Sequence, residues 1–351
     1  MAIERIDLNE RIVSKEATEE EKLFSWNLRP KNINEYIGQS TIIEKLMIAI
    51  TAAKMRKEPL EHILFYGPPG LGKTTLANII ANEMSSNLIT SSGPILDKKA
   101  DLMGVLTNLE HSDILFIDEI HRLSIVIEEF IYPAMEDFRT DFVVDRGAFA
   151  KTIKIPIKPF TLIGATTRAG LLSAPLRERF GLHYHLDFYP VDELVKIVKR
   201  SALLLSAEAE DDAAFEIARR GRGTPRIVNR LLRRVRDYAI VKNKGKITLE
   251  VAQKSLKLEG IDNMGLDELD RNYLKLIIDF YNGGPVGIEA IAATLDEESD
   301  TLVDMVEPYL LKIGFISRTK GGRLVNQAAY NHMKIDYPRQ QFNTGLNLVN
   351  S

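Results

Sequence analysis

At positions 67–74 the chain reads Gly67-Pro68-Pro69-Gly70-Leu71-Gly72-Lys73-Thr74, which fits the pattern G-x-x-x-x-G-K-[ST]. The apolar run at 62–66 precedes it and predicts a buried strand, and a helical pattern begins at Lys73. Glycines let backbone N–H groups turn inward around phosphate oxygens, where the dipole of the following helix also favours negative charge. The sequence therefore predicts a nucleotide-binding loop, with Lys73 on the β- and γ-phosphates and Thr74 on Mg²⁺.

A second apolar run, Ile114-Leu115-Phe116-Ile117, ends in the two carboxylates of Asp118 and Glu119. Such a strand end is costly to bury unless the acids have a task. We expect Asp118 to hold Mg²⁺ through water and Glu119 to polarise an attacking water molecule. On its own, an acidic pair here is usually a loop or a helix cap. The phosphate-binding loop upstream favours an ATPase over a GTPase or a small-molecule kinase.

The order of predicted elements indicates an α/β fold. A third apolar run at 160–165 and helical patterns at 42–50 and 125–135 suggest strands alternating with helices, hence a parallel sheet covered on both faces. After about residue 190 the pattern is helical only. From about 260 it is helical until two short runs at 315–318 and 323–325 flank Thr319-Lys320-Gly321-Gly322, a hairpin signal.

Composition narrows the function classes. The 351 residues suggest two or three domains, and the net charge of −3 does not announce a nucleic-acid binder. The absence of cysteine excludes disulfides, thiol catalysis and Cys-ligated metals, and the six histidines do not cluster at metal-binding spacing. No apolar stretch is long enough to span a membrane, and the polar N-terminus lacks a signal sequence, so we expect a cytoplasmic protein.

Further motifs give the chain a family resemblance. The stretches Gly164-Ala165-Thr166-Thr167-Arg168, Arg177-Glu178-Arg179-Phe180 and Gly223-Thr224-Pro225-Arg226 follow the first two motifs in the order of the AAA+ ATPases. Within that class the chain resembles the RuvB family of Holliday junction branch migration motors. The narrower resemblance rests on Arg29-Pro30, Tyr36-Ile37-Gly38-Gln39, residues 132–138 and residues 314–319.

The resemblance covers about residues 20–334 and implies a domain order. We expect a flexible arm at 1–20, an AAA+ ATPase core with a parallel sheet at 21–184 and a helical lid at 185–258. A winged-helix domain at 259–334 and a disordered tail at 335–351 complete the chain.

The resemblance also implies roles in ATP hydrolysis. Thr167 corresponds to the sensor of the γ-phosphate, with Thr166 the weaker candidate, and Arg226 to a second sensor on the lid. Arg179 corresponds to an arginine finger that enters the neighbouring subunit's site, which is sound chemistry for phosphoryl transfer. Arg177 would assist it, and the bland alternative for both is a surface pairing with Glu178. Further residues are implied to border the adenine: Leu28, Arg29, Glu136, Asp137, Phe138 and Tyr189. The other implied nucleotide contacts are Gly67, Pro68, Gly70, Gly72 and Thr75.

Two regions are candidates for DNA contact. Arg318 and Arg323, on the predicted hairpin, match positions that the resemblance implies touch DNA phosphates; the alternative is a solvated basic hairpin in a protein-interaction module. Eight arginines lie within 219–236 and suggest a DNA-binding stripe. Because Ile227, Leu231 and Val235 recur on one face there, part of this helix is expected to pack inward.

A predicted strand within 149–160 alternates apolar residues with lysines. It is either an ordinary edge strand or, by the resemblance, a hairpin that docks a RuvA-type junction-binding partner through Ile153 and Ile155. The implied function is ATP-driven branch migration of four-way DNA junctions by a homohexameric ring in recombination and repair, with a RuvC-type resolvase as a further partner. The alternatives are a clamp-loader or initiator-like ATP switch on DNA, and a winged-helix adaptor whose nucleotide sets only its assembly.

Overall fold

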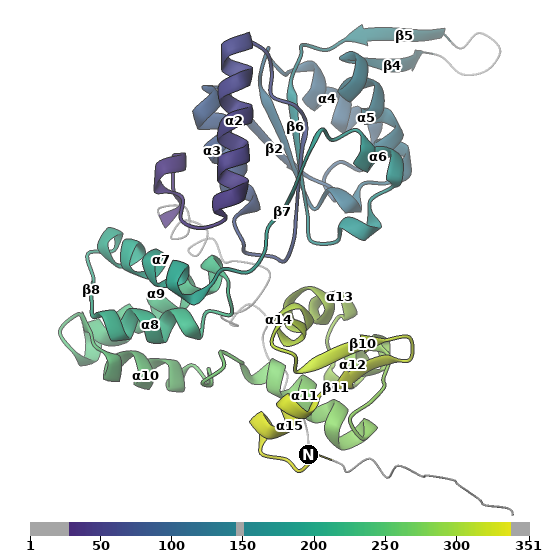
Figure 1. Ribbon diagram of the computed structural model, residues 1–351. Coiled ribbons are helices and arrows are strands. Elements are labelled where there is room, and N and C mark those ends of the chain that lie inside the picture. The colour runs from purple at the N-terminus through teal and green to yellow at the C-terminus, as the bar shows by residue number, and fades with distance from the viewer. Residues whose placement is uncertain (1–27, 145–150, 338–351) are drawn as a thin grey trace, which may run out of the picture. The chain divides into compact units, whose positions relative to one another are not determined.

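The computed structural model describes residues 28–144 and 151–337 (Figure 1). They form two compact units, one within Asn9–Gly265 and one within Leu266–Ser351. The second unit begins at Leu266, seven residues after the expected start at 259. The predicted arm at 1–20 and all but three residues of the predicted tail lie outside the described residues.

A five-stranded sheet forms the centre of the first unit, with the order β2-β3-β6-β1-β7 and every pair parallel. In that order the strands are β2 (Leu88–Ser92), β3 (Ile114–Asp118), β6 (Thr161–Thr166), β1 (Ile63–Tyr66) and β7 (Leu182–His185). The three central strands are almost wholly buried, which explains their continuous apolar runs. The predicted α/β class with a parallel sheet is confirmed.

Helices cover both faces of this sheet (Figure 1). Alternation along β1 sends Ile63 and Phe65 to one face and Leu64 to the other. The first face packs against α2 (Ser40–Arg56) and α3 (Lys73–Met84), and the second against α4 (Lys99–Thr107), α5 (Ile125–Asp137) and α6 (Ala174–Glu178). Single 3₁₀ turns lie at η1 (Ile33–Glu35), η2 (Ile120–Arg122) and η3 (Ala169–Leu171).

The helical lid belongs to the same unit as the sheet. Its elements are α7 (Val191–Leu204), β8 (Glu208–Ala209), α8 (Asp211–Arg219), α9 (Pro225–Lys242), β9 (Lys246–Ile247) and α10 (Leu249–Leu258). Leu231 and Val235, four residues apart on α9, are fully buried as their spacing predicts. One hydrophobic cluster includes these side chains together with Ile63 and Phe65 of the sheet, so lid and sheet share a core.

The second unit has the order of a winged helix, with helices first and a hairpin after them. Its elements are α11 (Glu268–Tyr281), α12 (Ile288–Leu295), α13 (Ser299–Thr301), the π-helix η4 (Leu302–Val306), α14 (Glu307–Lys312), β10 (Ile316–Thr319), β11 (Gly322–Val325) and α15 (Gln327–Met333). The strands pair antiparallel around Lys320 and Gly321, which confirms the predicted hairpin. These elements enclose a hydrophobic core of their own.

A second hairpin extends from the first unit. Antiparallel β4 (Arg139–Val144) and β5 (Lys151–Pro156) project away from the sheet (Figure 1). The strand predicted within 149–160 is confirmed over β5. Of the remaining predicted positions, 149 and 150 lie outside the described residues, and 157–160 follow the end of the strand.

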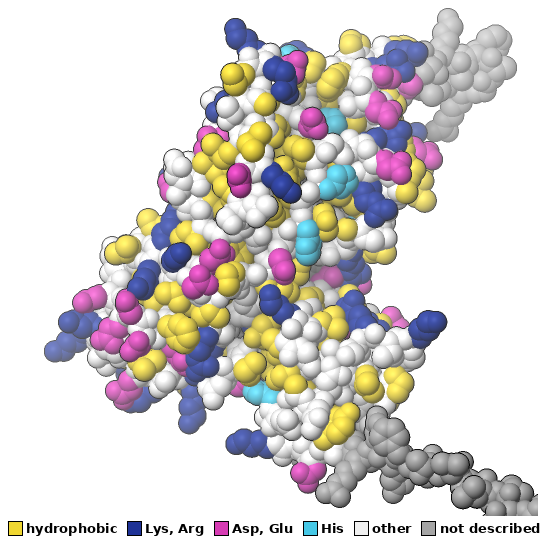
Figure 2. All heavy atoms as spheres, in the orientation of Figure 1, with side chains coloured by type: hydrophobic (Ala, Val, Ile, Leu, Met, Phe, Trp, Pro, Cys, Tyr) yellow, Lys and Arg dark blue, Asp and Glu magenta, His cyan; other side chains and the backbone are white. Residues whose placement is uncertain are grey.

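Charges of both signs are interspersed over the face of the protein that Figure 2 shows. This distribution agrees with the small net charge of −3. Within the described ranges, every helix is too short or too polar to cross a lipid bilayer.

Candidate functional site

The strand order brings three motifs that are distant in the chain to one edge of the sheet. β6 lies between β1 and β3, so the strand ends that lead into the phosphate loop, into Thr167 and into Glu119 are consecutive. Ligands of open parallel sheets bind outside these carboxyl ends. The edge therefore assembles phosphate-binding and acidic groups as the motifs predict.

Two glycines of the phosphate loop are required by its backbone. Gly67 has φ +138°, and a Cβ there would lie 2.2 Å from the carbonyl oxygen of Leu186. Gly70 has φ +78°, and its Cβ would lie 2.7 Å from Cγ2 of Thr224 on the lid. The loop is thus packed against the lid segment that carries Arg226, whose N–H donates to the Gly70 carbonyl at 3.4 Å.

Lys73 points back into the loop from the first turn of α3. Its side chain is buried, and Nζ donates to the carbonyl oxygens of Gly67 at 2.8 Å and Pro68 at 2.9 Å. Thr74 and Thr75 follow on the same helical turn and are half-buried. The ammonium group and the helix N-terminus therefore converge on the interior of the loop, where phosphate would lie.

The acidic pair sits on a strained backbone. Asp118 ends β3, and its Oδ1 accepts the N–H of Glu119 at 3.0 Å. Glu119 has φ +48°, a left-handed conformation that is uncommon for a residue with a side chain and that concentrates at functional sites. Its Oε2 accepts from Thr167 Oγ1 at 3.3 Å and lies 3.2 Å from His121 Nδ1. The structure thus brings Glu119 and Thr167 together.

His121 and Thr166 complete this cluster. Oγ1 of Thr166 lies 2.9 Å from His121 Nδ1 and accepts the N–H of Arg168 at 2.9 Å. Thr166 therefore lies at hydrogen-bond distance from the histidine, while Thr167 bonds Glu119 directly. Sequence reasoning assigned no role to His121, because a histidine two residues after a carboxylate carries no signal by itself.

The predicted adenine-side residues lie where the sheet meets the lid. Leu28 is buried, and Tyr189 Oη lies 2.8 Å from Tyr36 Oη and donates to the carbonyl of Leu71 at 3.3 Å. Burial, opposed by the hydrogen bond from Tyr36, raises the pKa of Tyr189 to about 12, so its hydroxyl keeps its proton. Burial lowers the pKa of Arg29 while the charge of Asp118 opposes this shift, which places the guanidinium within electrostatic range of the acidic pair.

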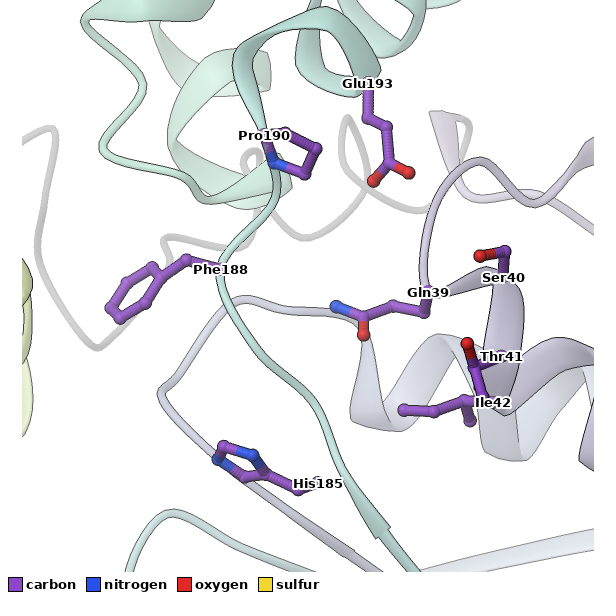
Figure 3. Close-up of a pocket in the computed structure, with 8 residues that line it drawn as sticks. All are labelled: Gln39, Ser40, Thr41, Ile42, His185, Phe188, Pro190 and Glu193. Atoms are coloured by element: carbon purple, nitrogen blue, oxygen red, sulfur yellow. The ribbon is translucent and has the colours of Figure 1, made fainter.

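A cavity of about 330 Å³ lies between the start of α2 and the segment that joins β7 to α7 (Figure 3). Gln39 donates from Nε2 to the carbonyl of Asp187 at 2.6 Å, and the Glu193 carboxylate points toward it (Figure 3). Burial, followed by the charge of Asp192, raises the pKa of Glu193. The lining residues are Gln39, Ser40, Thr41, Ile42, His185, Phe188, Pro190 and Glu193. None of them was predicted to contact nucleotide.

Arg179 lies at the opposite edge of the sheet from the phosphate loop. It precedes β7 by three residues, and the first N–H of β7, from Leu182, pairs with His62 at the start of β1. The four residues of β1 span about 13 Å, so an arginine at this edge does not reach its own phosphate loop. Its Nε lies 3.2 Å from Glu136 Oε1, and its guanidinium stacks 4.1 Å from the Tyr132 ring centroid.

Glu136, Asp137 and Phe138 lie far from the phosphate loop of their own chain. These residues end α5, which runs antiparallel to the strands and finishes where the strands begin. The neighbouring Met135 carbonyl lies 3.0 Å from His62 Nε2, and the Phe138 carbonyl accepts from Ile157 N–H at 2.7 Å. They therefore lie at the opposite end of the strands from the phosphate loop.

The arginine run at 219–236 is in part structural. Arg219 and Arg220 both pair with Glu216, whose side chain is 5% exposed. Arg219 also donates to the Asn263 carbonyl at 2.8 Å, and Arg220 donates to the Ile261 carbonyl at 3.1 Å. These bonds fasten residues 261–263 to the lid, which explains why the second unit begins later than expected.

The remaining predicted contacts lie on the two hairpins. Arg318 and Arg323 face each other across β10 and β11, and both donate to Glu307. On β5, Ile153 is 50% exposed and Ile155 is half-buried, opposite Thr140 in the register.

Comparisons with known proteins agree along the whole described chain. Three family models match in succession: the Holliday junction DNA helicase RuvB P-loop domain at 28–186, the RuvB AAA lid domain at 189–262 and the RuvB C-terminal winged helix domain at 263–334. Two relatives are each described as a Holliday junction branch migration complex subunit RuvB. The one from Desulfosudis oleivorans is 56% identical over 328 residues, which are 93% of this chain and 95% of the relative. The one from Ligilactobacillus salivarius is 54% identical over 331 residues, 94% and 98% of the two chains.

A solved structure supports the same relation. The RuvB Holliday junction branch migration motor of Thermotoga maritima superposes with a TM-score of 0.82 at 52% identity. The match covers 89% of this chain and 100% of that one.

Proposed function

The chain belongs to the RuvB family, and from that membership we propose that it is the ATP-hydrolysing subunit of a Holliday junction branch migration complex. The observation that carries the proposal is the strand order, which sets the phosphate loop, Thr167 and Glu119 side by side at one edge of the sheet. An ATP switch or a winged-helix adaptor would share this edge. The motor is favoured because the relatives that cover nearly the whole chain are named as branch migration subunits.

Within this proposal Lys73 would leave the loop carbonyls to bind phosphate oxygens, and Glu119 would orient the attacking water and accept its proton. Thr167, bonded to Glu119, would report the γ-phosphate. Arg226, at the contact of lid and loop, would move the lid when the nucleotide changes. Leu28, Arg29 and Tyr189 would enclose the adenine.

Mg²⁺ fits the residues at this edge. No three His, Cys, Asp or Glu side chains gather as a metal cage among residues 28–144 and 151–337. Mg²⁺ in nucleotide sites is typically held by one or two protein groups together with the phosphates and water, and Thr74 with Asp118 is such a set. The ion would neutralise phosphate charge during transfer.

We place Arg179 in the active site of a neighbouring subunit. Its position across the sheet from its own loop supports action in trans, and Glu136 and Tyr132 would hold it at that surface. Each site would then be complete only in a closed ring, which we propose is a homohexamer. Glu136, Asp137 and Phe138 would meet the neighbour's nucleotide rather than their own.

The other partners would bind at the two hairpins. Arg318 and Arg323 would contact phosphates of duplex DNA, and Ile153 with Ile155 would dock a RuvA-type protein that holds the four-way junction. A RuvC-type resolvase would act on the same junction.

The direct test is ATP-driven dissociation of a synthetic four-way junction, with and without a RuvA-type partner. Lys73→Ala and Arg179→Ala should each abolish dissociation of the junction. Arg177→Ala changes a neighbouring arginine, and retained activity in that variant would identify Arg179 as the arginine finger. ATP turnover without junction dissociation under any condition would favour the loader or switch.

Mixing the two inactive variants tests the trans assignment. A site formed by Lys73 of one subunit and Arg179 of its neighbour is intact in a mixed ring. The mixture should therefore regain part of the ATPase activity that neither variant has alone. No recovery in rings that demonstrably contain both variants would contradict a finger in trans.

A further inference from the structure

In the second unit, two arginines share one carboxylate. Arg318 donates from Nε to Glu307 Oε2 at 2.7 Å, and its terminal nitrogen bonds the same oxygen. Arg323 donates from Nε to Oε1 at 2.7 Å. Tyr273 donates its hydroxyl to Oε1 at 2.8 Å. Both oxygens of Glu307 are therefore occupied by donors from three elements.

The burial of these groups is unequal. The Glu307 side chain is 0% exposed and that of Arg323 is 17% exposed, while that of Arg318 is 46% exposed. Burying a carboxylate is costly, and a well-packed apolar residue often serves stability as well or better. A fully buried carboxylate whose cations reach the surface therefore suggests a task at that surface.

The backbone before Glu307 is adapted to place it. The π-helix η4 ends at Val306, and the N–H of Glu307 donates to the Leu302 carbonyl, five residues back. An α-helix advances about 100° per residue, so the wider turn rotates Glu307 relative to a regular helix. Single π-turns are frequent at functional sites, and here the turn directs a carboxylate to the hairpin.

The carboxylate also makes the arginine pair tenable. Arg318 and Arg323 are direct cross-strand partners, and like charges in that position repel. Although burial lowers the pKa of Arg323, its hydrogen bond and attraction to Glu307 raise it overall, so the guanidinium stays charged. The cluster of two arginines and one carboxylate therefore carries a net charge of +1.

We propose that Glu307 is a positioning residue for DNA binding. It holds the Nε edges of both guanidinium groups, so that their remaining N–H groups face a phosphate of duplex DNA. This inference rests on the proposed DNA contact of Arg318 and Arg323. A carboxylate that fixes an arginine in this way spares it the entropy of ordering on binding.

The test measures the binding of the full chain to a mixed-sequence DNA duplex. Fluorescence anisotropy gives the affinity at several salt concentrations. Glu307→Gln keeps the size of the side chain but removes the charge and one acceptor. We expect affinity to fall about tenfold, the equivalent of one lost charge-assisted bond. The slope of log K against log[salt] should become shallower by about 0.9, the equivalent of one phosphate contact.

Two controls separate positioning from folding. Tyr273→Phe removes a hydrogen bond to the same carboxylate but leaves both arginine pairs, and it should bind within twofold of wild type. In the Arg318→Ala/Arg323→Ala background, Glu307→Gln should have no further effect on binding, because no guanidinium remains to position. If Glu307→Gln does not fold, Glu307→Asp, one methylene shorter with its charge intact, should show the same pattern.

Unchanged affinity and slope in Glu307→Gln would overturn the inference. An equal loss of affinity when Glu307→Gln is added to Arg318→Ala/Arg323→Ala would also overturn it, because the carboxylate would then act through the fold. Wild-type binding by Arg318→Ala/Arg323→Ala is a separate result, and it would refute the DNA contact itself. ATP-driven junction dissociation measured in parallel shows whether the motor assignment survives that result.

Discussion

Glu216 in the lid and Glu307 in the winged helix are both buried carboxylates that bind two arginines. Glu216 takes its partners from the same helical segment, Arg219 and Arg220, three and four residues on. Glu307 takes Arg318 and Arg323 from the two strands of a hairpin, 11 and 16 residues on. The two clusters have the same charges, but the remaining N–H groups of their arginines have different partners.

At Glu216 the spare guanidinium donors bind residues 261–263, through two backbone carbonyls and one side chain. Arg220 is 6% exposed and donates to the Ile261 carbonyl and to Asn263 Oδ1. At Glu307 neither arginine donates to a backbone carbonyl among the described residues, and Arg318 is half exposed. An arginine cluster is therefore structural where backbone takes its donors, and available to a ligand where solvent does. Charge density alone does not distinguish these cases.

The largest effect that tests this contrast is on stability. Glu216→Ala leaves Arg220 buried without its counter-charge, and we expect it to lower the free energy of unfolding by about 3–5 kcal/mol. Urea unfolding followed by circular dichroism measures this change. Glu250→Ala removes an exposed carboxylate that pairs with Lys254 on α10, and it should leave the urea midpoint near wild type. Equal midpoints for both variants would show that the lid cluster is not structural.

A crossed pair of variants sharpens the contrast. Arg220→Ala should cost about 2 kcal/mol of stability because it leaves a buried carboxylate short of a donor, with DNA affinity unchanged in the folded protein. Arg318→Ala leaves Glu307 bound by Arg323 and Tyr273, and it should lower duplex affinity about tenfold while the protein stays folded. Denaturation and anisotropy on both variants check the prediction. A loss of DNA affinity in Arg220→Ala without unfolding would return the lid arginines to the DNA-binding candidates.

This contrast also marks what sequence could predict. The phosphate loop, the three central strands of the sheet and the hairpin of the second unit were predictable, because each depends on local spacing and turn chemistry. The inward-packing face of α9 was visible in the recurrence of Leu231 and Val235.

Contacts between distant elements were not predictable. Nothing near Glu307 in the sequence indicates two partners on a later hairpin, and the π-turn that directs it has no simple signature. The position of residues 136–138 could not be predicted either, because the direction of α5, which decides the end of the sheet at which they lie, is a property of the fold. Arg219 and Arg220 resembled a basic stripe until their carboxylate and carbonyl partners were known.

A smaller effect concerns pH. Although burial raises the pKa of Glu216, its hydrogen bonds and attraction to Arg219 and Arg220 dominate and lower it from the ordinary value of 4.5. A carboxylate with a lowered pKa stabilises the fold above its ordinary pKa, and the stabilisation disappears as pH falls through the lower, folded value. The stability difference between wild type and Glu216→Gln should therefore be full at pH 6 and shrink below about pH 4.5. Thermal unfolding from pH 3 to 7 measures it, and a difference independent of pH would contradict the ionised pairing.

The smallest expected effect distinguishes the charge of Arg318 from its geometry on the β10–β11 hairpin. Arg318→Lys keeps the positive charge but loses the planar fork that bonds Glu307 with one edge and leaves the other edge to a phosphate. We expect duplex affinity to fall only about two- to threefold, with the salt slope unchanged because the number of neutralised phosphates is the same. Anisotropy titrations at several salt concentrations resolve this change from that of Arg318→Ala. If lysine and alanine are equally weak, the fork rather than the charge carries the contact, and positioning by Glu307 matters more than the net charge of the cluster.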